Sequence, residues 1–287
     1  MKKKILAAII FLIPLLLAPA FADTVILKSG KQVEGRIVED TQGYLTIETA
    51  DGNSVSYNKN TIEAVNSPQG GSSHLSLKTV LIDRSEKGYL LFIPKEVSSA
   101  LPSTFLVCLP GMGISAKQDI NNWAFYAAKN GFIVVALDVD YGLIRSVPDV
   151  DSLYLKISGI LASLKNEYSL ANNEVCIAGT SAGGMMSIAL GLRYPDKFIA
   201  VGVVSGAKFN FGAEGDLKNA RGKRFCIVHG GNDKIVPVSE FYSTKEQLER
   251  NGALVNSEVF PEGEHTLPSS AYQEVIVWLP KLRRQLK

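Results

Sequence analysis

The segment from residue 174 to residue 194 limits the fold more than any other part of the chain. Glu174 to Ala178 is a mostly apolar run typical of a buried strand, residues 179–183 are Gly-Thr-Ser-Ala-Gly, and a helical pattern runs from Ala182 to Tyr194. A chain that passes from strand to helix so abruptly must bend sharply, and small residues around Ser181 permit the bend. The bend exposes the serine hydroxyl beside the positive end of the helix. A glycine-rich helix start without chemistry is the alternative interpretation.

Apolar runs and helical stretches alternate from residue 77 to residue 287, which predicts an α/β fold with a mostly parallel sheet flanked by helices. The predicted strands are 79–83, 89–94, 105–109, 132–139, 174–178, 199–204, 225–229 and 257–260. The predicted helices are 120–129, 149–168, 182–194, 239–251 and 269–286.

Residues 23–66 follow a different pattern. Short alternating runs at 25–27, 33–38, 44–47 and 54–57 are separated by glycine-containing turns, which predicts a small antiparallel β module. Its general pattern is similar to that of SH3-like barrels. Residues 67–76 contain Ser-Pro-Gln-Gly-Gly-Ser-Ser, a composition typical of a flexible linker between this module and the α/β domain.

The first 22 residues have the organisation of a signal peptide. Lys2 to Lys4 are basic, an apolar stretch extends from Ile5 to about Ala18, and Ala20-Phe21-Ala22 has the small-x-small pattern read by signal peptidase. We expect cleavage after Ala22 and a periplasmic or extracellular protein. An uncleaved anchor helix is the alternative interpretation.

The chain contains three cysteines, Cys108, Cys176 and Cys226. Each lies within a predicted strand, where free cysteine is typically buried. Buried thiols are therefore predicted, although an exported protein could also form a disulfide. None of the three follows a strand at a sharp turn, which argues against a cysteine nucleophile.

Serine needs a base and an orienting acid to act as a nucleophile, and around this type of turn the acid and then the histidine follow the serine along the chain. Only His265 fits that order, because His74 lies in the linker and His229 precedes the candidate acid. We therefore predict that His229 is structural. Asp233 follows a strand and a Gly-Gly turn, so we predict that it orients His265. An ordinary surface histidine and a solvated turn aspartate are the alternatives. Glu262 and Glu264 are reserve acids, but both lie very near His265 in sequence.

The negative oxygen of a tetrahedral intermediate would need backbone donors. The amide after the nucleophile, that of Ala182, is one candidate. The loop after the third strand of the α/β domain reads Leu-Pro-Gly-Met-Gly, which makes the Met112 amide the second candidate. No metal or organic cofactor is implied.

Residues 77–286 resemble the α/β-hydrolase superfamily. The resemblance rests on two motifs, Gly-Thr-Ser-Ala-Gly-Gly and Leu-Pro-Gly-Met-Gly. The superfamily's secreted polyhydroxybutyrate depolymerases, feruloyl esterases and related carboxylesterases are the most similar branches. The resemblance implies hydrolysis of carboxylic esters through an acyl-enzyme. These esterases usually have His-Gly in the oxyanion loop, whereas this chain has Pro110-Gly111, so the superfamily role is expected and the subfamily stays open.

The segment from Gly206 to Leu217 is too short for a large cap domain, which predicts an open site for bulky or polymer-linked esters. Tyr141, Phe209 and Phe211 are candidate wall residues, with ordinary core packing as the alternative.

The 30 basic and 28 acidic residues are well mixed along the chain, so the sequence shows no basic patch of the kind that binds nucleic acid.

Two rival functions remain. A peptidase or amide hydrolase could use the same three residues. An inactive envelope-associated binding protein could instead rely on residues 23–66.

Overall fold

A computed structural model describes residues 23–40, 44–49, 54–66, 79–84, 87–94, 103–168 and 170–281 of the chain. The predicted signal peptide at 1–22, the linker at 67–76 with His74, and the end of the last predicted helix lie outside these residues. Within the described residues, no helix is both long enough and apolar enough to cross a membrane.

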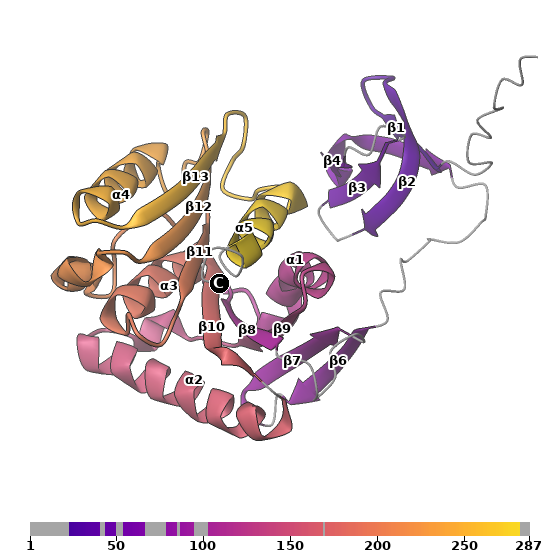
Figure 1. The fold of residues 1–287 in the computed structure, drawn as a ribbon. Helices are drawn as coiled ribbons and strands as arrows, with labels where there is room; N and C mark the ends of the chain where they lie inside the picture. The colour runs from indigo at the N-terminus through magenta and orange to yellow at the C-terminus, as the bar shows by residue number, and fades with distance from the viewer. Residues whose placement is uncertain are drawn as a thin grey trace, which may run out of the picture.

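The described residues form two sheets, one in the N-terminal module and one in the larger domain (Figure 1). The larger sheet has eight strands in the order β13-β12-β11-β10-β8-β9-β7-β6. These strands are β6 (Thr79–Arg84), β7 (Tyr89–Pro94), β8 (Ser103–Leu109), β9 (Phe132–Leu137), β10 (Leu170–Thr180), β11 (Ala200–Val204), β12 (Arg224–Gly230) and β13 (Leu254–Phe260). Neighbours from β13 to β9 pair in parallel, whereas β7 pairs antiparallel with both β9 and β6.

Five α-helices cover the two faces of this sheet: α1 (Ala116–Lys129), α2 (Val147–Glu167), α3 (Ala182–Arg193), α4 (Val238–Arg250) and α5 (Ser269–Lys281). Buried side chains of α2, α3 and α4 pack into one hydrophobic cluster, and those of α1 and α5 pack into another on the opposite face. The central strands contribute side chains to both clusters, because successive residues of a strand point to opposite faces of the sheet. All eight predicted strands and all five predicted helices are present; β7 has its predicted bounds, and most of the others differ by a few residues at one or both ends.

Helix α1 begins four residues before its predicted start. The backbone N–H of Ala116 donates to Asp138 Oδ1 at 2.6 Å, and the N–H of Gln118 donates to Ser115 Oγ at 3.3 Å. These acceptors satisfy first-turn donors that have no partner within a helix. One of them comes from the loop after β9, so the helix start depends on a contact that the local sequence does not reveal.

The N-terminal module is a five-stranded antiparallel sheet in the order β4-β3-β2-β1-β5. Its strands are β1 (Asp23–Leu27), β2 (Gln32–Asp40), β3 (Tyr44–Glu48), β4 (Ser54–Asn58) and β5 (Ile62–Asn66). The sequence patterns predicted the first four strands and missed β5, whose residues follow a 3₁₀ turn at Lys59–Thr61. The module has its own small core, formed mainly by Val25, Leu27, Val33, Leu45 and Ile47.

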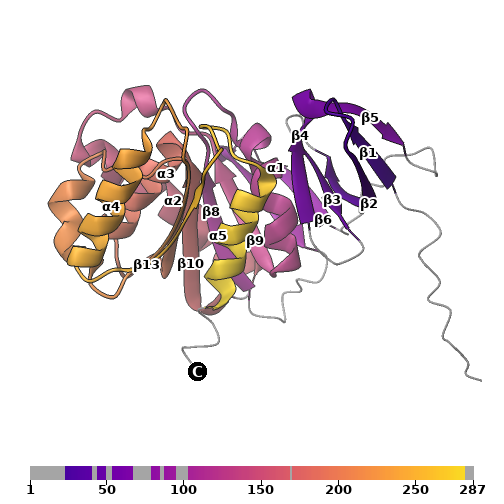
Figure 2. The ribbon, with the colours of Figure 1, turned by 90° about the horizontal axis from the view of Figure 1, so that it is seen from above.

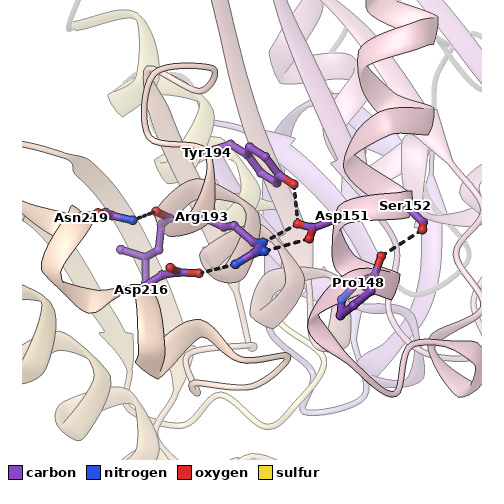
Figure 3. A network of polar contacts seen from close by, with 8 residues as sticks. Pro148, Asp151, Ser152, Arg193, Tyr194, Asp216 and Asn219 are labelled. Atoms are coloured by element: carbon purple, nitrogen blue, oxygen red, sulfur yellow. Dashed lines mark hydrogen bonds and ion pairs between the residues drawn. The ribbon is translucent and has the colours of Figure 1, made fainter.

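A polar network holds the far end of α3 (Figure 3). Arg193 binds Asp151 of α2 and also Asp216 of η4 (Ala213–Ala220), and the Tyr194 hydroxyl donates to Asp151 as well. Hydrogen bonds from Arg193 and Tyr194 lower the pKa of the Asp151 carboxyl to about 2. The network therefore joins α2, η4 and the helix whose opposite end begins beside Ser181.

Candidate active site

Ser181 lies in a backbone conformation that few non-glycine residues adopt. Its φ of 53° and ψ of −118° place it between the end of β10 and the first residue of α3. A Cβ on Gly179 would lie 2.3 Å from the backbone of Gly183, and a Cβ on Gly183 would lie 2.0 Å from the carbonyl oxygen of Leu109. Both glycines are therefore required by close backbone contacts, which explains why this strained turn carries them.

His265 and Asp233 extend from Ser181 as a chain of hydrogen bonds. His265 Nε2 lies 2.9 Å from Ser181 Oγ, and His265 Nδ1 lies 2.7 Å from Asp233 Oδ2. A carboxylate only accepts, so Nδ1 carries the ring proton and Nε2 is left to accept the serine hydroxyl proton. The structure thus brings together the three residues that sequence order had selected.

Asp233 is held from several sides in the loop after β12. Its side chain is buried, and Oδ1 accepts the backbone N–H groups of Ile235 at 2.8 Å and Val236 at 2.9 Å. His229, which we predicted to be structural, is also buried, and its Nε2 donates to the Val236 carbonyl at 2.8 Å. Burial lowers the pKa of His229, so its ring stays neutral 3.4 Å from Asp233 Oδ2. These contacts fix the carboxylate in the orientation that His265 requires.

The loop after β8 runs alongside the serine. A Cβ on Gly111 would lie 3.5 Å from Ser181 Cβ, and the next residue, Met112, has a side chain that is 67% exposed. The Tyr141 hydroxyl donates to the Pro110 carbonyl at 2.7 Å, and burial raises the pKa of Tyr141, so the hydroxyl stays a donor. Tyr141 therefore fixes the direction of the peptide that links Pro110 to Gly111.

The three aromatic wall candidates differ in their surroundings. Tyr141 is only 5% exposed, and its ring stacks on that of Phe211 with centroids 5.9 Å apart. Phe209 is partly buried and packs against the main hydrophobic cluster of the domain. The structure brings Tyr141 and Phe211 together near the loop after β8, and Tyr141 is mainly a packing residue whose hydroxyl binds that loop.

Sequence reasoning missed a buried acid behind the serine. Asp119 of α1 is 3% exposed, and it accepts hydrogen bonds from Trp123 Nε1 at 2.9 Å and Thr180 Oγ1 at 3.0 Å. Burial raises the pKa of Asp119 to about 6. The aspartate is one helical turn from Trp123 on the apolar face of the helix, a placement that the sequence contained and that could have revealed its burial.

Cys108, Cys176 and Cys226 are buried thiols, as predicted. Among the described residues, no group of three or more histidine, cysteine, aspartate or glutamate side chains is arranged to hold a metal ion.

Residues 152–282 match the family described as phospholipase/carboxylesterase. The match includes Ser181, Asp233 and His265, and it leaves the N-terminal module and the first strands of the larger sheet outside. The comparison with curated proteins gave no match.

Several solved structures are similar to this chain at low sequence identity. TT1662 from Thermus thermophilus aligns with a TM-score of 0.54 and 18% identity over 71% of this chain and 96% of its own. The S-formylglutathione hydrolase from Staphylococcus aureus has a TM-score of 0.54 and 17% identity over 71% of this chain and 94% of its own. Esterase 2 from Thermogutta terrifontis, solved with butyrate bound, has a TM-score of 0.53 and 17% identity over 69% of this chain and 89% of its own. These likenesses show that the larger domain has the α/β-hydrolase fold.

Proposed function

We propose that this protein is a serine hydrolase that cleaves carboxylic esters through an acyl-enzyme on Ser181. The observation that carries the proposal is the continuous hydrogen-bond chain from Ser181 through His265 to Asp233. The match to the phospholipase/carboxylesterase family and the fold shared with several esterases support the same class of reaction.

The geometry suits nucleophilic attack by serine. His265 Nε2 takes the hydroxyl proton as Ser181 Oγ attacks the ester carbonyl carbon, and Asp233 stabilises the imidazolium that forms. Collapse of the tetrahedral intermediate breaks the bond to the leaving alcohol, which takes the proton from Nε2. Water, deprotonated by His265, then attacks the acyl-enzyme, releases the acid and restores the serine.

Backbone amides of Ala182 and Met112 are the proposed oxyanion donors. Ala182 is the first residue of α3, so its N–H lies at the positive end of that helix. Met112 follows Gly111 in the loop that lies against Ser181 and that Tyr141 holds. Such donors stabilise the transition state when they are fixed in advance, and losing one typically costs about 100-fold to 1000-fold in turnover.

The rim around the site favours esters with an apolar group. The exposed side chains of Met112, Ile114, Leu143 and Ile235 all lie in loops that follow parallel strands of the central sheet. Loops after parallel strands meet at one edge of a sheet, the edge at which Ser181 also follows β10. Their exposed apolar surface can contact an acyl chain or an apolar leaving group, and we propose Phe211 as a further wall residue.

The test compares the wild type with Ser181→Ala on a panel of short-chain and long-chain acyl esters, feruloyl and acetylated-sugar esters, hydroxybutyrate oligomers and aminoacyl amides. We expect the wild type to cleave esters faster than amides and to react with a fluorophosphonate label. Ser181→Ala should lose the label and on the order of 10⁶-fold in kcat. Ser152→Ala, which changes an exposed serine on α2, is the matched control.

Three results would contradict parts of this proposal. Ester hydrolysis that survives in Ser181→Ala would refute the mechanism. Amide cleavage at rates near those for esters would favour the peptidase function. A wild type that neither binds the label nor hydrolyses any substrate would favour the inactive binding protein.

We further propose that the protein is exported by cleavage after Ala22. Strand β1 begins at Asp23, whose carboxylate accepts the backbone N–H of Ile37 at 2.8 Å, so the cut would leave an ordered module intact at its first residue. Mass spectrometry of the protein purified from an exporting bacterial host should give a chain that begins at Asp23. A chain that keeps residues 1–22 in the membrane fraction would favour an anchor instead.

A further inference from the structure

Hydrogen bonds connect the N-terminal module to the loop that carries His265. The Tyr44 hydroxyl of β3 donates to the carbonyl oxygen of Thr266, the residue after His265, at 3.0 Å. Thr46 Oγ1 and Ser56 Oγ lie 2.8 Å and 2.9 Å from Ser269 Oγ, at the first residue of α5. Both views of the ribbon show the module beside α5 and α1 (Figures 1 and 2).

The burial pattern of β3 shows that this contact covers a polar face of the module. Successive strand residues point to opposite faces, so Leu45 and Ile47 fill the core of the module and Thr46 points away from it. An outward-facing threonine on a small sheet is normally exposed, yet Thr46 is only 1% exposed. Its burial arises because the larger domain covers it, and Ser269, its partner there, is only 4% exposed.

The His265 loop is held by different partners on its two sides. Before His265, the N–H of Asn232 donates to the Gly263 carbonyl at 2.8 Å, a contact within the larger domain. After His265, Leu267 is buried in the cluster of α1 and α5, and the Thr266 carbonyl accepts from Tyr44 of the module. Ser269 Oγ contacts Thr46 and Ser56 of the module and also accepts from the Tyr126 hydroxyl of α1 at 3.2 Å. The backbone that leaves the histidine is therefore fixed in part by a separate domain.

We propose that the N-terminal module positions the catalytic base, with Tyr44 and Thr46 as positioning residues for His265. The inference rests on the proposed function of Ser181 and His265. Tyr44 and Thr46 act through the backbone of the loop, on the distance between His265 Nε2 and Ser181 Oγ. Burial raises the pKa of Tyr44, so its hydroxyl remains a donor at neutral pH. Because their contacts reach the base and not the oxyanion loop, their loss lowers kcat and leaves KM nearly unchanged.

The experiment uses the full mature chain and the variant Tyr44→Phe, which removes one hydroxyl. The expected result is a threefold to tenfold lower kcat and fluorophosphonate reaction rate, the range that one neutral hydrogen bond allows. Tyr57→Phe is the matched control, since its ring packs on the inner side of the same module. A second readout needs no substrate: the far-downfield proton resonance of His265 Nδ1–H should shift or broaden in Tyr44→Phe and stay in place in Tyr57→Phe.

Two substitutions, Thr46→Val and Thr46→Ser, distinguish a loss of positioning from a folding defect. Valine keeps the shape of threonine and loses the hydroxyl, whereas serine keeps the hydroxyl, so Thr46→Val should slow the reaction and Thr46→Ser should restore most of it. If the wild type reacts and both Tyr44→Phe and Thr46→Val match it in kcat and in the proton resonance, the positioning role is overturned. A wild type that does not react with the label contradicts the proposed function instead. If Tyr44→Phe and Tyr57→Phe slow the reaction equally, the effect is one of module stability and the inference also fails.

Discussion

The buried Asp119 should make the stability of the larger domain depend on pH. Its carboxyl accepts hydrogen bonds from Trp123 and Thr180, yet burial outweighs them and raises its pKa from 3.8 to about 6. In the unfolded chain the same group returns to its ordinary pKa. Between these two values the folded protein binds more protons than the unfolded one, so stability falls as pH rises.

The size of this effect follows from the difference between the two pKa values. A pKa difference of about two units corresponds to about 3 kcal/mol, and most of it, about 2 to 3 kcal/mol, is lost between pH 4 and pH 7.5. Asp119→Asn removes the titration. The free energy of unfolding of the variant, relative to the wild type, should therefore rise by about 2 to 3 kcal/mol over that interval, whatever the fixed offset caused by the amide.

Urea unfolding followed by tryptophan fluorescence measures this difference. Both tryptophans, Trp123 and Trp278, lie in the larger domain, and Trp123 contacts Asp119 directly. Asp149→Asn is the control, because a hydrogen bond from Ser146 lowers the pKa of Asp149 and its titration falls below this interval. A difference between Asp119→Asn and wild type that stays constant from pH 4 to pH 7.5 would refute the argument.

Two further variants test the site itself by steady-state kinetics. Asp233→Asn should lower kcat by about 10⁴-fold with little change in KM, because His265 loses the partner that fixes its tautomer, and a loss under tenfold would contradict that role. Tyr141→Phe leaves the Pro110 carbonyl without its donor, a cost of about 1 to 3 kcal/mol that should lower kcat by about tenfold to a hundredfold. Tyr154→Phe, in the stacked pair with Tyr194, should leave kcat unchanged, and equal effects of the two tyrosine variants would rule out a specific role for Tyr141.

The strands and helices of the larger domain could be predicted because their signals are local. Buried parallel strands such as β9 are apolar along their whole length, and its burial pattern has no exposed position. The sharp turn at Ser181 was predictable for a related reason: Gly179 and Gly183 are fixed by backbone contacts within or near the turn. His265 could be selected because it is the histidine that follows the candidate acid, and Asp233 because it follows a predicted strand and a Gly-Gly turn.

Other parts of the site depend on contacts that no local pattern contains. The role of Tyr141 depends on a carbonyl in a different loop, 31 residues away in sequence. Asp119 precedes the predicted start of its helix at residue 120, and its raised pKa arises from burial by the surrounding core, which no local pattern contains. Strand β5 was missed because its recognition depends on pairing with β1, at the other end of the module.

The contact between Tyr44 and Thr266 spans 222 residues and illustrates the limit most clearly. Tyrosine, threonine and serine on the outer face of a small sheet are ordinary strand residues, and nothing in that composition separates a covered face from an exposed one. The contacts of Tyr44, Thr46 and Ser56 across this face join hydroxyls to one another and to a carbonyl. Neutral hydrogen bonds of this kind contribute about 0.5 to 1.5 kcal/mol each after exchange with water. On the proposed function, contacts of that strength shift the distance between His265 and Ser181 and so adjust the rate, whereas the hydrogen-bond chain from Ser181 through His265 to Asp233 remains held by the larger domain.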